Sequence, residues 1–153
     1  MKLVGKRGIS GILEVITVLL MVVALGLMVG LWWIIPSVTG RHFGMGENYF
    51  EKYFIVLMLA GVLAECVLWQ LRGILHNINE QMPFCRDNVR RLRIMATECL
   101  VLGALFAVGV LFVSRVFMAV VFVTFVVVGL VLLVFSELFK QAVSYKEENE
   151  STI

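Results

Sequence analysis

Two glutamates, Glu65 and Glu98, stand inside long apolar stretches of the sequence, where a charged side chain is costly. A charge near the centre of a bilayer costs at least about 2.5 kcal/mol, so an intramembrane carboxylate indicates either a function or a dedicated polar network. The chemistry open to this pair is a shared proton, a bound cation, or a hydrogen-bonded network with Gln70 and Thr97 that fixes helix packing.

Each of these glutamates lies seven residues from an arginine. Glu65 precedes Arg72 by this spacing. Glu98 follows Arg91 by the same spacing. Seven residues are nearly two helical turns, so each glutamate shares a helix face with an arginine about 10 Å away. In antiparallel helices the two glutamates then lie at similar depth, and they could form the upper ends of a Glu–Arg network.

The segment 72–93 is the most polar internal part of the chain and carries five arginines. Leu71, Ile74 and Ile78 recur at helical spacing, which predicts that the preceding helix continues to about Asn79. A Pro-Phe turn and a second, arginine-rich helical pattern follow. The sequence therefore predicts a helical hairpin with a cationic surface.

This cationic surface fits two kinds of contact, which are anionic lipid headgroups and a docked protein. Each basic residue near an anionic membrane adds roughly 1 kcal/mol of attraction. The residues predicted to form the surface are Arg72, Pro83, Phe84, Arg86, Asn88, Arg90, Arg91 and Arg93. The acidic run of the C-terminal tail either pairs with these arginines or stays solvated. Its members are Glu147, Glu148, Asn149 and Glu150.

The composition determines which elements position these groups. Hydrophobic residues make up 61% of the 153 positions and charged residues 16%, and the mean hydropathy is +0.98. A soluble domain is about a quarter charged, and one of this size could not bury so much apolar surface. The predicted fold is all-α and polytopic. It is a four-transmembrane-helix bundle with a cytoplasmic helical-hairpin extension between its second and third helices.

Four apolar segments match the roughly 20 residues that cross a bilayer as a helix. Strands would leave backbone groups unpaired in lipid, which favours a helix even for the valine-rich last segment. The predicted spans are residues 12–35, 53–71, 94–113 and 116–139, in a single domain of residues 1–153. The rest is a solvated connector at 36–52, the loop 72–93, a turn at Ser114-Arg115 and the tail 140–153.

Pairs of small residues four positions apart recur in these spans. Gly26 and Gly30 form a GxxxG pattern, and Gly103 with Ala107 forms a similar pair. Such pairs allow helices to approach closely. We predict that they pack within the four-helix bundle rather than in a dimer interface.

Lysine and arginine are distributed unequally between the two sides of the predicted spans. Ten lie in the N-terminal segment, the 72–93 loop and the tail, whereas three lie on the other side. Basic residues concentrate in cytoplasmic segments of membrane proteins. This bias predicts that both termini and the 72–93 loop are cytoplasmic.

Two stretches of the sequence resemble a known family. They are Leu71-Arg72-Gly73-Ile74-Leu75 and, after Pro83-Phe84, Asn88-Val89-Arg90-Arg91-Leu92-Arg93. The chain resembles domain-of-unknown-function family 2975, the YoaS-like small bacterial membrane proteins. Its ending, Glu148-Asn149-Glu150-Ser151-Thr152-Ile153, is similar to the acidic terminus of that family. Three positions depart from the family pattern. This chain has Gln81 where the family often has a glycine, Cys85 where it has a Thr or Ser helix cap, and Ser151 where it has a leucine.

The resemblance implies a bacterial cytoplasmic (inner) membrane and no established activity. It also implies a cytoplasmic protein partner, since members are often encoded beside a small helix-turn-helix regulator. Membrane lipids are the other expected partner.

An enzyme is not predicted. The two histidines fall on opposite sides of the membrane, no Ser or Cys has an evident base, and no phosphate-cradling glycine loop occurs. The three cysteines form no CxxC motif, so neither a metal site nor a cofactor is expected. A net charge of +2 does not favour direct nucleic-acid binding.

The leading hypothesis is a non-enzymatic membrane protein that regulates or anchors a cytoplasmic partner through the 72–93 loop and the tail. The first alternative is a small proton- or cation-coupled transporter that uses Glu65 and Glu98. Gly11-Ile12-Leu13-Glu14-Val15 is faintly similar to the first-helix glutamate region of small multidrug resistance transporters. The second alternative is an immunity-type protein against a membrane-active peptide. The oligomeric state is left open.

Overall fold

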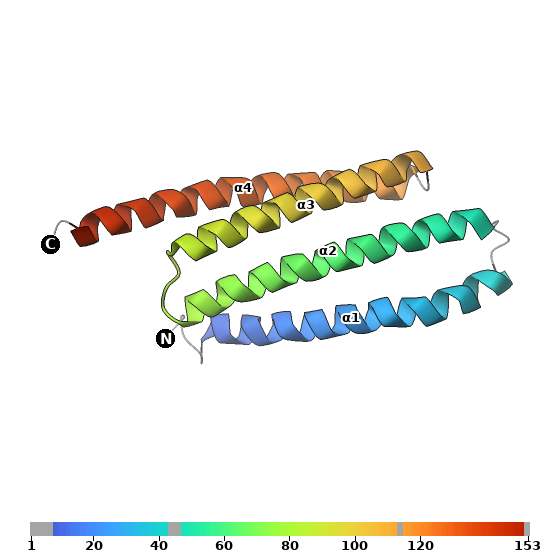
Figure 1. The fold of residues 1–153 in the computed structure, drawn as a ribbon, viewed down its shortest axis with the longest axis horizontal. Helices are drawn as coiled ribbons and strands as arrows, with labels where there is room; N and C mark the ends of the chain where they lie inside the picture. The colour runs from blue at the N-terminus through green and yellow to red at the C-terminus, as the bar shows by residue number, and fades with distance from the viewer. Residues whose placement is uncertain (1–7, 43–46, 113–114, 152–153) are drawn as a thin grey trace.

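The computed structural model describes residues 8–42, 47–112 and 115–151, and all regular structure in these ranges is helical (Figure 1). The four helices are α1 (Ile9–His42), α2 (Glu47–Asn79), α3 (Arg86–Phe112) and α4 (Arg115–Ser151). Each contains a segment long and apolar enough to cross a membrane. The prediction of an all-α protein with four membrane-spanning helices is confirmed. The chain is a multi-pass membrane protein.

The helices run farther than the predicted spans. α1 continues across Pro36 to His42, and α2 already begins at Glu47. The predicted connector over residues 36–52 is therefore helical, and not a loop, for most of its length. The apolar spans of α1 and α2 still leave it out. Water can satisfy backbone groups in a loop or in a helix end equally well, so apolar composition does not mark where a helix stops outside the lipid. The predicted turn residue Ser114 lies outside the described residues, between the end of α3 and the start of α4.

The helices pack in chain order, in an open row. α1 contacts α2, α2 contacts α3, and α3 contacts α4, and within the described residues no backbone contact joins α1 to α3 or α4. Consecutive helices run in opposite directions, so the start of α1, the α2–α3 turn and the end of α4 lie at one end of the molecule (Figure 1). We call this end the polar end.

α3 is the central helix, and two apolar clusters surround it. One cluster contains Leu102 and Phe106 of α3 with Ala60 of α2 and Met118 of α4. The other, nearer the polar end, contains Ile74, Leu92 and Met95. In α3, 39% of the most apolar 18-residue segment is buried, whereas in α1 and in α2 only 6% of the corresponding segment is buried. Most of the surface of α1 is thus left for lipid.

Glycines set how closely α3 approaches α4. A Cβ at Gly129 would lie 2.9 Å from the Leu100 side chain and 3.2 Å from the backbone oxygen of Ala96. A Cβ at Gly103 would lie 3.1 Å from Val126 Cγ2. The close-approach prediction is therefore confirmed at Gly103, and the structure adds Gly129.

The packing prediction for the GxxxG pattern of α1 is wrong. A Cβ at Gly26 would have no neighbour within 4 Å, and one at Gly30 would meet only Ile34 of its own helix. The contact between α1 and α2 uses Gly61 instead, where a Cβ would lie 2.9 Å from Met28 Sδ.

α2 ends in a Schellman motif that turns the chain towards α3. The amide of Met82 donates to the carbonyl of Asn77 at 3.0 Å, and the amide of Gln81 donates to the carbonyl of Ile78 at 3.1 Å. Gln81 has a φ of 62°, the left-handed conformation that glycine usually adopts at this position. The predicted helix end near Asn79 is confirmed.

Candidate functional site

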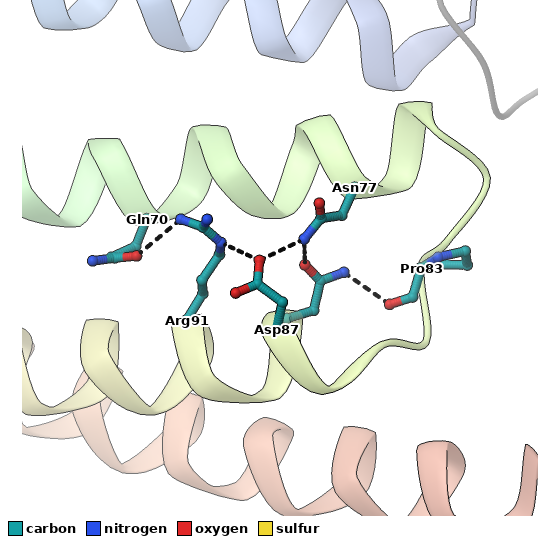
Figure 2. Close-up of polar contacts among 6 residues, drawn as sticks. Gln70, Asn77, Pro83, Asp87 and Arg91 are labelled. Atoms are coloured by element: carbon teal, nitrogen blue, oxygen red, sulfur yellow. Dashed lines mark hydrogen bonds and ion pairs between the residues drawn. The ribbon is translucent and has the colours of Figure 1, made fainter. Parts of the chain in front are cut away.

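A polar network fastens the beginning of α3 to the end of α2 (Figure 2). Its centre is Asn88, whose side chain is fully buried. Asn88 Nδ2 donates to the carbonyl of Pro83 at 2.9 Å, and its Oδ1 accepts from Asn77 Nδ2 at 2.7 Å. Both functional atoms of the amide are therefore used. A buried amide satisfied on both sides fixes the geometry of the turn.

Asp87 and Arg91 of α3 extend the network to further residues of α2. Asp87 Oδ2 accepts from Asn77 Nδ2 at 2.9 Å and from Arg91 Nε at 2.7 Å. Arg91 Nη1 donates to Gln70 Oε1 at 3.3 Å. A Cβ at Gly73 would overlap the Arg91 guanidinium, so this turn of α2 needs a glycine for the guanidinium to lie across it.

The stretches that carry the family resemblance supply most of this network, because Gly73, Pro83, Asn88 and Arg91 all belong to them. A model of the family described as protein of unknown function, DUF2975, matches residues 9–153. The chain belongs to this family. No curated protein and no solved structure matches it. For this DUF2975 member, the structure gives the family-like residues a physical task, which is to hold the α2–α3 hairpin rigid.

A second set of contacts joins α3 to α4 at the polar end. Arg86 donates from Nε and Nη2 to the two carboxylate oxygens of Glu147, at 2.8 and 2.7 Å. Arg93 pairs with Glu137, which also lies 3.7 Å from Lys140 Nζ. Bidentate arginine–carboxylate pairs are geometrically specific, although exposed ones contribute little stability. Of the two readings of the acidic tail, pairing with the arginines occurs at Glu147.

The last turn of α4 has a different environment. Glu150 lies 3.8 Å from Lys146 of its own helix, and both Glu148 and Asn149 are exposed. α4 stays helical to Ser151. The tail is therefore a helical extension with acidic side chains.

The remaining residues of the predicted cationic surface are spread over the hairpin. The Arg72 guanidinium lies 5.7 Å from the centre of the Trp69 ring, a cation–π contact. The ring of Phe84 lies 5.6 Å from that of Phe139 on α4, and its side chain is still 45% exposed. Arg90 forms no hydrogen bond or ion pair with any residue that the structure describes.

The predicted intramembrane set is not joined by hydrogen bonds in the described residues. Gln70 accepts from Arg91, and the Thr97 hydroxyl donates to the carbonyl of Arg93 at 2.9 Å. Glu65 Oε1 and Glu98 Oε2 are buried without a hydrogen-bond partner. Within the described ranges, no group of three or more His, Cys, Asp or Glu could hold a metal ion.

Sequence reasoning missed the contact that fastens α1 to α2. Asn79 Nδ2 donates to Glu14 Oε2 at 2.5 Å, and His76 Nδ1 lies 3.4 Å from Glu14 Oε1. Glu14 is the only acidic residue in the first 46 positions of the sequence. This isolated carboxylate was the feature of the sequence that could have indicated a polar contact of α1. The structure assigns it a helix-joining position.

Proposed function

We propose that this chain is a non-enzymatic protein of the bacterial inner membrane that anchors or regulates a cytoplasmic protein docked on its polar end. The observation that supports this most is the network around Asn88, which holds the α2–α3 hairpin in one conformation. A preorganised surface loses less conformational entropy when a partner binds. Rigid presentation of the turn is what a docking platform needs.

The charge distribution supports a cytoplasmic polar end. Seven described arginines and lysines lie towards this end: Arg72, Arg86, Arg90, Arg91, Arg93, Lys140 and Lys146. Lys52, at the start of α2, lies towards the other end. Basic residues favour the cytoplasmic side. The start of α1 and the end of α4 would then also face the cytoplasm.

The surface proposed for docking combines exposed apolar and charged groups. Met82 and Phe84 are 54% and 45% exposed beside the turn, and Arg86 stands next to them. The acidic end of α4 extends past the same turn (Figure 1). Apolar anchors with a charged rim are typical of protein interfaces. A small helix-turn-helix regulator is the partner that the family resemblance suggests.

A photo-crosslinker placed at Met82 in intact cells should give one discrete protein adduct, because the partner covers this side chain. The adduct is measured by its mass shift and identified by mass spectrometry. The matched control position is Val127, which is 53% exposed in the apolar part of α4. The same adduct from position 127 would contradict docking at the polar end.

The swapped pair R86E/E147R separates docking from folding. It restores the ion pair with reversed polarity, so it removes the repulsion from Glu147 that R86E alone creates, and the small change in thermal stability should be reversed. A partner that recognises the charge of Arg86 should be lost in both the single and the swapped variant. An adduct that survives the swap would show that Arg86 is not part of the docking surface.

A second candidate function, a proton- or cation-coupled transporter, is favoured by the two buried carboxylate oxygens of Glu65 and Glu98. Proteoliposomes with an internal pH dye should then show proton flux under a valinomycin-set potential. E65Q/E98Q should abolish the flux, while E150Q on the exposed tail should retain it. Absence of flux in the unmodified protein, or flux that survives E65Q/E98Q, rejects this function.

A further inference from the structure

The polar end contains a groove of about 500 Å³ between the first turns of α3 and the last part of α4. Its cationic side chains are Arg86, Arg90, Arg93 and Lys140, and its lining includes the apolar Val89 and Val143. We propose that this groove binds the phosphate headgroup of one anionic phospholipid, whose acyl chains lie on the outer face of α3. This site lies beside the docking surface at the turn and shares Arg86 with it.

The charge in the groove is complementary to a phosphate. Two carboxylates, Glu137 and Glu147, face four cations, so the cations are not fully neutralised. Arg90 lines the groove between Arg86 and Arg93 on the same helix face and has no hydrogen bond or ion pair in the described part of the chain. The Asp87 carboxylate attracts Arg90 electrostatically but accepts no hydrogen bond from it. The guanidinium therefore remains available for bidentate hydrogen bonding to phosphate oxygens.

The face of α3 that bears the arginines continues into the membrane as an apolar stripe. Arg93, Thr97, Val101, Ala104, Val108 and Leu111 follow one another at spacings of three or four residues, and all six are exposed. Residues at this spacing share one helix face. A ligand on this face meets cationic groups at one end and about three turns of apolar surface beyond them.

This arrangement matches a phospholipid better than a soluble phosphate compound. Basic pockets between membrane helices, close to the membrane surface, bind anionic lipid headgroups. The apolar floor and the adjoining stripe would give a free phosphate nothing to bind, whereas acyl chains cover them. The occupant is therefore a lipid with a negatively charged phosphate headgroup.

Native mass spectrometry of the purified full-length protein tests the site. Phosphatidylglycerol and phosphatidylcholine with identical acyl chains are titrated into the detergent-solubilised protein. We expect one phosphatidylglycerol per chain to bind in preference to phosphatidylcholine. R90Q should weaken phosphatidylglycerol binding about fivefold, the loss expected for one basic residue. R90K, which keeps the charge, should weaken it by less.

R72Q is the matched control, because Arg72 is an exposed arginine on α2 and does not line the groove. It should leave phosphatidylglycerol binding unchanged. K140Q reports on the groove from α4 and replaces R90Q as the test if that variant fails to fold.

Three results would overturn the proposal. The first is equal binding of the two lipids. The second is an equal loss in R72Q and in the groove variants, which would indicate diffuse attraction. The third is displacement of the lipid by millimolar glycerol phosphate, which would identify a soluble phosphate compound as the ligand.

Discussion

Replacing Asn88 with aspartate should lower the free energy of unfolding by about 3 kcal/mol, since breaking a buried polar pairing and leaving a charge unpaired is strongly destabilising. N88D conserves the shape of the side chain and exchanges the Nδ2 donor for an oxygen. In the unmodified protein the carbonyl of Pro83 accepts from Asn88 Nδ2 at 2.9 Å, so in N88D this carbonyl would face an oxygen instead of a donor. The new charge would also lie beside Asp87. The measurement is the unfolding midpoint of the purified protein in detergent.

The control for N88D is N149D, which makes the same chemical change on the exposed last turn of α4 and should leave the midpoint unchanged. Lowering the pH should return part of the stability of N88D, because a protonated carboxyl can again donate to the carbonyl of Pro83. The importance of the network would be refuted if N88D unfolded at the same midpoint as N149D.

Gly129→Ala should cost about 2 kcal/mol, within the range for overpacking a close contact. The added methyl group would meet the Leu100 side chain at 2.9 Å and the Ala96 backbone oxygen at 3.2 Å. A side chain could rotate away, but the backbone oxygen moves only if α3 and α4 separate. The expected result is a lower unfolding midpoint, together with weaker protection of α3 and α4 amides in hydrogen exchange.

Gly26→Ala is the matched control, because it adds the same methyl group on α1, where no atom beyond its chain neighbours and the nearby backbone of its own helix lies within 4 Å. Its midpoint should stay constant or rise slightly, since alanine has the higher helix propensity. Equal destabilisation by both substitutions would mean that glycine acts through backbone flexibility and not through helix packing. The comparison also tests whether α1 lacks a packing partner at this position within the chain.

The order of the helices explains why the two largest predicted losses of stability involve α3. This helix carries Asn88 at its beginning and the Ala96 carbonyl that faces Gly129, and it packs against both α2 and α4. α1 is fastened to α2 chiefly through Glu14 and its contacts at Asn79 and His76, and through Met28 at Gly61. Substitutions on the lipid-facing surface of α1 should therefore have small effects on stability.

The sequence alone determined the class of the protein and the number and type of its helices. Lipid provides no hydrogen-bonding partners, so every backbone group within a span must be satisfied inside its own segment. This requirement is local, and the four long apolar stretches are enough to predict four helices. The sequence also predicts the hairpin, because Leu71, Ile74 and Ile78 repeat at helical spacing up to the turn.

Only the tertiary structure decided which helix packs on which. Lipid tails are as apolar as leucine, so no hydrophobic stripe records the partner of a membrane helix, and packing depends on shape and on a few polar contacts. For this reason Gly26 and Gly30 predicted a contact that the structure does not make, while Gly129 makes one without a pattern. The same holds for Glu14 with Asn79 and Arg86 with Glu147, which are 65 and 61 residues apart. Such pairs exist only after the open row of helices has brought them to the polar end.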